Sequence, residues 1–168
     1  LWVSDVPAMG FKTYSIVAGQ NTKPEAGDMG RSLENAFYKI DIDESKGVVS
    51  SIYDKELQIE LVDPLDSLSL GNFIYEQLGN RHEMERLTGS RRDTVYKPLN
   101  LKRSLMTDVK LIRSHSGAIY NSLFLNGKMP VCTDNRGIDI EIRLYHYAKK
   151  IELHYSMHKL EVTNPEAV

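Results

Sequence analysis

The stretch Ile138-Asp139-Ile140-Glu141-Ile142-Arg143-Leu144-Tyr145 decides the fold class of this 168-residue chain. Its apolar residues occupy every second position, a spacing that places them on one face of a β-strand. A second alternating run, Ile151-Glu152-Leu153-His154-Tyr155-Ser156-Met157-His158, follows after a short break at Ala148-Lys149-Lys150. We expect the two runs to pair as a long antiparallel hairpin with one packed apolar face and one polar face.

The same period of two predicts strands in other parts of the chain. Residues 36–42 and 48–53 alternate on either side of a loop that ends in Gly47, which predicts a second β-hairpin. Asn126-Gly127 predicts a tight turn between two later strands. Further strands are expected at 12–17, 57–62, 109–114, 119–125 and around Val131. The predicted fold class is therefore mainly β, with two packed antiparallel sheets.

The remaining segments set the expected domain boundaries. Residues 1–17 are expected to contain the end strand of a preceding module, and the glycine-containing stretch 18–31 to be a linker or loop. Residues 32–168 are expected to form a β-sandwich domain that is truncated at its C-terminus, so the chain would be a fragment of a longer protein. Within it, residues 77–104 are predicted to leave the sheet as a long excursion, with a helical turn at 81–87.

Composition excludes several classes of function. The chain carries 21 basic and 23 acidic residues, a net charge of −2, whereas a nucleic-acid-binding protein needs a basic surface. Hydrophobic residues make up 41% of the chain, as in globular proteins, and no apolar run reaches the 18 or so residues of a membrane helix. We therefore expect no nucleic-acid partner and no membrane partner. The single Cys132 excludes an internal disulfide and a cysteine-rich zinc site.

No self-contained catalytic set is evident from the residues alone. His154 and His158 share one face of a predicted strand, with His146 across the hairpin, but the spacing matches no metal-binding motif. Solvent-facing polar positions explain these histidines more simply. The chain lacks a nucleophile elbow, and its many carboxylates lie mostly in predicted turns, so spacing singles out no acid–base pair.

Residues 34–57, E-N-A-F-Y-K-I-D-I-D-E-S-K-G-V-V-S-S-I-Y-D-K-E-L, resemble the start of the β domain of family 38 alpha-mannosidases. The resemblance includes an Asn-x-Phe-Tyr strand at Asn35, a turn that ends in glycine, and an Ile-Tyr-Asp-Lys-Glu strand followed by an acidic stretch at 60–63. Residues 5–14, 70–76 and 144–168 also resemble segments of this family. The 77–104 excursion carries no motif of the family.

This resemblance implies an antiparallel β-supersandwich of the galactose-mutarotase-like type, located C-terminal to a catalytic α/β barrel. The expected partners are that N-terminal catalytic barrel of the same chain and a mannose-containing glycan. The barrel would supply the zinc ion and the nucleophilic Asp of a retaining mechanism, so no cofactor is expected in these 168 residues. The fragment alone is expected to lack mannosidase activity, because the scaffold that holds both carboxylates is missing.

The resemblance also implies that this domain supports the barrel and lines one edge of the sugar site. The candidate substrate-binding residues are Asn72, Tyr75 and Glu76; the alternative for Tyr75 is packing within a sheet. No catalytic residue and no metal ligand is assigned to this chain.

Two other functions stay open. A stand-alone carbohydrate-binding module would use surface aromatic residues such as Tyr145, Tyr147 and Tyr155. A mutarotase-like enzyme would need His146, His154 or His158 beside a glutamate.

Overall fold

The computed structural model describes residues 6–15, 30–63, 65, 68–82, 100–133 and 136–167 of the chain. Within this described part the chain forms antiparallel β-structure, as its alternating sequence predicts. The strands are β1 (Ser32–Glu34), β2 (Tyr38–Asp43), β3 (Val48–Asp54), β4 (Ile59–Glu60), β5 (Ile74–Leu78), β6 (Leu101–Leu105), β7 (Thr107–Ser116), β8 (Tyr120–Lys128), β9 (Ile138–Tyr145), β10 (Ile151–Met157) and β11 (Glu166–Ala167).

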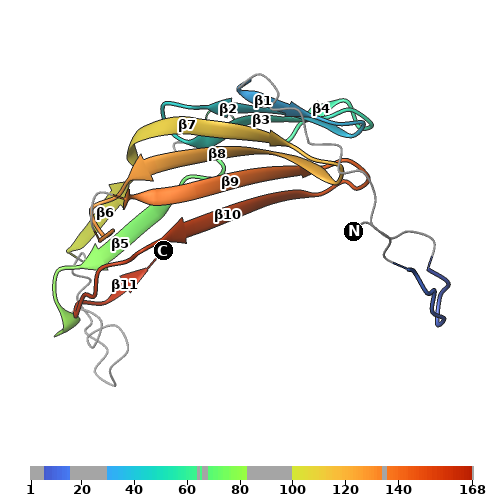
Figure 1. The fold of residues 1–168 in the computed structure, drawn as a ribbon. Helices are drawn as coiled ribbons and strands as arrows, with labels where there is room; N and C mark the ends of the chain where they lie inside the picture. Colours follow the sequence, from blue (N-terminus) through green and yellow to red (C-terminus); the bar gives the residue numbers. More distant parts are fainter. Residues whose placement is uncertain are drawn as a thin grey trace, which may run out of the picture.

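The strands form three sheets. The first has the order β1-β2-β3-β4, the second β10-β9-β8-β7 and the third β11-β5-β6. Figure 1 shows the long strands of the second sheet side by side, with the third sheet at the end opposite the loop that joins β9 to β10. The predicted mainly β, antiparallel class is therefore confirmed.

One hydrophobic core joins the first two sheets. Alternate residues of β9 are nearly inaccessible, with Ile138 at 0% and Leu144 at 1% relative exposure, while the residues between them face outward. Ile40 from the first sheet is equally buried and belongs to the same apolar cluster. This alternation is the arrangement of a sandwich, in which the inner faces of two sheets share a core and the outer faces are polar. We call the face that bears Asp139, Glu141 and Arg143 the outer face of the second sheet.

Both predicted hairpins are confirmed. β9 pairs with β10 in a continuous register that places Leu144 opposite Ile151. β2 pairs with β3 around the 44–47 turn, where Gly47 adopts a positive φ of 67°. The predicted third strand at 57–62 is shorter than expected, since only Ile59–Glu60 pairs with β3.

The predicted turn at Asn126-Gly127 is wrong. Both residues lie inside β8 and pair with β9, Gly127 opposite Ile138. The glycine serves packing here, because a Cβ on Gly127 would lie 3.0 Å from a methyl group of Val109. A Cβ on Gly137 would lie 2.0 Å from the carbonyl oxygen of Gly127, so Gly137 allows the two backbones to approach closely. Val131, where another strand was predicted, lies in a turn.

The predicted excursion at 77–104 is wrong at its two ends, which lie in paired strands. β5 and β6 pair antiparallel, with Tyr75 opposite Ser104 and Leu78 opposite Leu101, so the segment leaves and re-enters through a paired stem. β11 adds to the other side of β5. Arg81 and His82 are helical, as the predicted turn at 81–87 requires, and the remainder of that turn lies outside the described residues.

The N-terminal predictions are tested only in small part. Residues 12–15 form no strand, and the rest of the predicted strand at 12–17 lies outside the described residues. Most of the predicted linker at 18–31 also lies outside them. The expected boundaries at 17 and 31 thus stay predictions. In the described part of the chain, no helix has the length and apolar character needed to cross a membrane.

Candidate functional site

The family-like motif of the sequence gathers at one end of the sandwich, where the side chain of Asn35 connects the two main sheets. Its Oδ1 accepts hydrogen bonds from the backbone N–H groups of Phe37 (2.8 Å) and Tyr38 (2.6 Å), which fixes the entry into β2. Its Nδ2 donates to the carbonyl oxygen of Tyr145 at the end of β9, 2.7 Å away. A short amide side chain suits this position because it can accept from one sheet and donate to the other.

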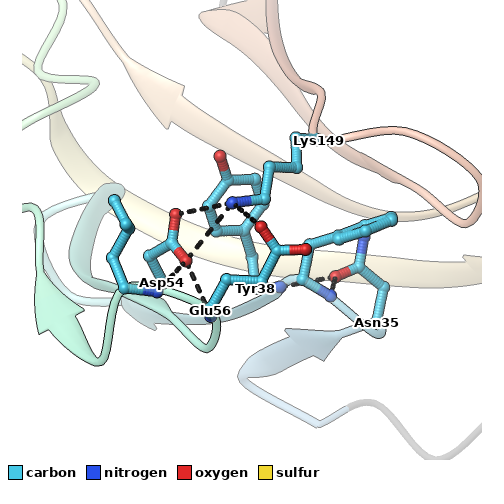
Figure 2. Close-up of polar contacts among 7 residues, drawn as sticks. Asn35, Tyr38, Asp54, Glu56 and Lys149 are labelled. Carbon is cyan, nitrogen blue, oxygen red and sulfur yellow. Dashed lines mark hydrogen bonds and ion pairs between the residues drawn. The ribbon is translucent and has the colours of Figure 1, made fainter.

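Asp54, at the end of β3, forms the second connection at the same end. Asp54 is 3% exposed. Its carboxylate accepts hydrogen bonds from the backbone N–H groups of Glu56 (2.9 Å) and Leu57 (3.0 Å). Lys149, from the loop between β9 and β10, places its ammonium nitrogen 3.2 Å from Asp54 and 2.5 Å from Glu56. Figure 2 shows Lys149 reaching from its loop toward both carboxylates.

We call Asn35, Asp54, Glu56 and Lys149 the end cluster. The backbone N–H of Leu57, together with the ammonium group of Lys149, lowers the pKa of the Asp54 carboxyl group. The hydrogen bond to Glu56, with that to Asp54, raises the pKa of Lys149. Each group is thereby held in its charged form around neutral pH. A general acid or base needs a pKa close to the working pH, so the end cluster has the properties of a structural connection.

The candidate residues Asn72, Tyr75 and Glu76 lie close in sequence but do not converge in space. Tyr75 and Glu76 are neighbours on β5, so their side chains point to opposite faces of the sheet. Tyr75 is 6% exposed, and its hydroxyl donates a 2.7 Å hydrogen bond to Glu166 of β11. Burial and this carboxylate raise the pKa of Tyr75 to about 12. Glu76 binds Arg103 on the neighbouring strand at 2.5 Å, and Asn72 lies in the turn before β5, partly exposed.

The histidines suggested for acid–base chemistry are also separated. His146 bonds the carbonyl oxygen of Gly117 at 2.8 Å, in the loop at one end of β9. His154 lies on β10 opposite Glu141, with its Nε2 3.0 Å from Glu152. His158 follows the end of β10. Of the three, His154 therefore has carboxylates beside it, on the outer face of the second sheet.

The surface tyrosines suggested for glycan binding lie on different surfaces. Tyr145 is on the outer face, where it packs against Tyr120 with ring centroids 5.4 Å apart and donates to Glu152. Tyr155 is on the opposite face, since it pairs with the buried Ile140, and its hydroxyl donates to the carbonyl oxygen of Gly71 at 2.7 Å. Tyr147 is exposed in the loop after β9. The three do not form one stacking platform.

The family resemblance places zinc in a catalytic barrel and not in this domain. Among the described residues, no group of three or more His, Cys, Asp or Glu side chains is arranged to hold a metal ion. The donor side chains of the described residues thus do not fit a metal centre.

Among the described residues, the end cluster is thus an internal polar connection between the sheets of an antiparallel β-sandwich. The family model of the glycosyl hydrolases family 38 C-terminal domain matches residues 33–164. The chain belongs to this family, as the sequence motifs predicted. No curated protein and no solved structure matches the chain significantly.

The family membership gives a coarse functional conclusion. The chain is the C-terminal, non-catalytic domain of a family 38 glycosidase, a domain that is normally part of a larger chain with a catalytic domain. Sequence reasoning identified Asn35 and Asp54 as motif residues without assigning them a role, and it did not single out Lys149. No local signal identifies this lysine, because its partners lie some 95 residues away in the chain.

Proposed function

We propose that this domain supports the catalytic barrel of an alpha-mannosidase-type glycosidase and lines the edge of its sugar site. The observation that carries the proposal is the internal use of the family motif: Asn35 and Asp54 bond other parts of the same domain. A domain whose motif residues maintain its own shape acts as a scaffold. The hydrolysis of terminal mannosides then belongs to the whole protein, with zinc in the barrel.

The segment Asn72–Glu76 is the part of the domain proposed to line the sugar site. Asn72 and Glu76 are partly exposed, and their amide and carboxylate groups can bond sugar hydroxyls. Tyr75 is proposed to hold β5 in place instead of touching the sugar, because its hydroxyl donates a hydrogen bond to Glu166 and thereby connects β5 to β11. The segment would then present Asn72 and Glu76 from a strand paired on both sides.

The test is the kinetics of the full-length protein on an aryl mannoside. Glu76→Gln keeps the size of the side chain but removes the charge, and we expect KM to rise about fivefold from the loss of one hydrogen bond of about 1 kcal/mol. Glu161→Gln, at an exposed carboxylate outside this segment, is the matched control and should leave KM unchanged. Equal KM values for both variants would show that Glu76 does not touch the sugar. An absence of mannosidase activity in the full-length wild type would overturn the proposal as a whole.

A second candidate function is carbohydrate binding by the domain itself. A hollow on the outer face of the second sheet favours it, and its residues are argued in the next subsection.

A further inference from the structure

A row of directly opposed residues crosses the second sheet on its outer face. Arg113 of β7 pairs with Phe124 of β8, Phe124 pairs with Glu141 of β9, and Glu141 pairs with His154 of β10. Directly opposed residues in an antiparallel sheet share a face, so these four side chains lie in line. The next row contains Asp139 opposite Ser156.

These two rows line a cavity of about 360 Å³, which we call the outer hollow. Its volume lies within the range of small-molecule sites, roughly 300–1,000 Å³. An irregularity in the pairing of β7 occurs between Leu111 and Arg113, and Ile112 at this point is 54% exposed and lines the hollow. Bulges of this kind are common beside binding sites because they redirect a side chain.

The chemistry of the outer hollow is mixed. Ile112 and Phe124 supply apolar surface, and the guanidinium of Arg113 lies 3.6 Å from the centre of the Phe124 ring. Asp139 and Glu141 supply acceptors, whereas Arg113 supplies donors. Within the described residues, the Ser156 hydroxyl and the Arg113 guanidinium form no hydrogen bond, so both are available to a ligand.

The charges indicate a neutral ligand. One arginine faces two carboxylates in the lining, so a phosphate or another anion would meet net repulsion. The hydrogen bond that Arg143 donates to Glu141 lowers the pKa of this carboxyl group, which keeps the acceptor ionised. A pyranose ring combines hydroxyl groups, which both donate and accept, with an apolar C–H surface. It therefore complements a lining that combines donors, acceptors and apolar groups.

We propose that the outer hollow binds one neutral pyranose unit of a glycan, separately from the sugar-site edge assigned to Asn72 and Glu76. This proposal rests on the proposed function in one respect only: both take a glycan as the ligand. It requires neither catalysis nor a metal ion in this domain. The binding site would lie on paired strands of the sheet. Arg113 and Ser156 would form hydrogen bonds to the sugar that they do not form with the described residues of the domain.

The experiment is affinity electrophoresis of the full-length protein in native gels that contain soluble mannan or, in parallel, dextran. Ser156→Trp fills the hollow from an exposed position of β10, and Arg113→Ala removes a donor. The controls are Thr107→Trp and Lys110→Ala, which make the same kinds of change at exposed positions of β7 outside the hollow. We expect the wild type and both controls to be retarded by at least one polysaccharide. Arg113→Ala should weaken the apparent affinity about fivefold, and Ser156→Trp should abolish the contribution of this site.

Equal retardation of all five proteins, or retardation of none, overturns the proposal. If Ser156→Trp lowers the unfolding temperature of the full-length protein while Thr107→Trp does not, another protein domain covers the hollow, and the proposal is also overturned. The turnover of an aryl mannoside separates this test from that of the proposed function. Such a small substrate should be hydrolysed equally by the wild type and Ser156→Trp, whereas Glu76→Gln should affect it.

Discussion

The end cluster and the outer hollow are both polar regions of one β-sandwich, but they use their polar groups differently. In the end cluster, Asn35 and Asp54 accept nearby backbone N–H groups. The bond from Asn35 to Tyr145 and the ion pair of Asp54 with Lys149 join the two main sheets. In the outer hollow, the polar groups of Arg113 and Ser156 form no hydrogen bonds with other described residues. A motif that identifies a family can therefore mark a structural connection, while a binding surface can lie where the sequence shows no motif.

The largest expected effect is the loss of Asn35. Asn35→Ala removes three hydrogen bonds, two that fix the entry into β2 and one that joins this entry to the end of β9. At about 1 kcal/mol each, we expect the free energy of unfolding to fall by about 3 kcal/mol. Urea unfolding of the full-length protein, followed in the transition of this domain, measures the change.

The matched control for this change is Asn126→Ala. Asn126 bonds the carbonyl oxygen of Arg136 and the carboxylate of Asp139, but both contacts are exposed to solvent. We expect a loss of no more than about 1 kcal/mol, because water replaces an exposed hydrogen bond readily. Similar losses for the two variants would contradict the structural role given to the end cluster.

The next effect concerns the dependence of stability on pH. The pKa of Asp54 is lowered in the folded state, so its contribution is present above the unfolded pKa of about 3.9 and is lost as pH falls through the folded value. The pKa of Lys149 is raised, so its contribution is present below its ordinary value of 10.5 and is lost as pH rises through the folded value. Lys149→Met should therefore destabilise the domain most between about pH 5 and 9.

Unfolding temperatures of the wild type and Lys149→Met across pH 3 to 11 test this expectation. The difference between the two proteins should shrink at both ends of the range. Lys46→Met is the control, because Lys46 forms a longer, exposed ion pair of 3.8 Å with Asp43. A pH-independent difference for Lys149→Met would show that the lysine acts through packing of its aliphatic chain instead of its charge.

The hairpins could be predicted from short stretches of sequence, because adjacent segments of the chain contain both paired strands and the turn between them. The alternation in 138–145 and 151–157 defines an inner and an outer face, and the short connection between them leaves only an antiparallel pairing. The third sheet could not be predicted in this way, since β11 joins β5 across some 90 residues. Asn126-Gly127 misled for a related reason: the glycine leaves room for the side chain of Val109 on the neighbouring strand, which no short window reveals.

The candidate sites also differ in whether local sequence or strand pairing identifies them. Asn72, Tyr75 and Glu76 were assigned by resemblance, and their role stays a prediction, although the burial of Tyr75 favours an indirect role for it. The outer hollow was not predicted, because Arg113, Phe124, Glu141 and His154 come from four strands whose register places them in line. The alternation alone indicates that these residues face outward, but the pairing decides which of them are neighbours.

The smallest expected effect on stability is at Ser156. Its hydroxyl lies on the exposed outer edge of the second sheet and bonds no described residue, so Ser156→Ala should change the free energy of unfolding by less than about 0.5 kcal/mol. Ser51→Ala is the informative comparison, because the Ser51 hydroxyl donates a 2.6 Å hydrogen bond to Glu60 and its loss should destabilise the domain more. A loss at Ser156 as large as that at Ser51 would mean that the hydroxyl already has a partner within the protein. The outer hollow would then resemble the end cluster, and its polar groups would not be available to a sugar.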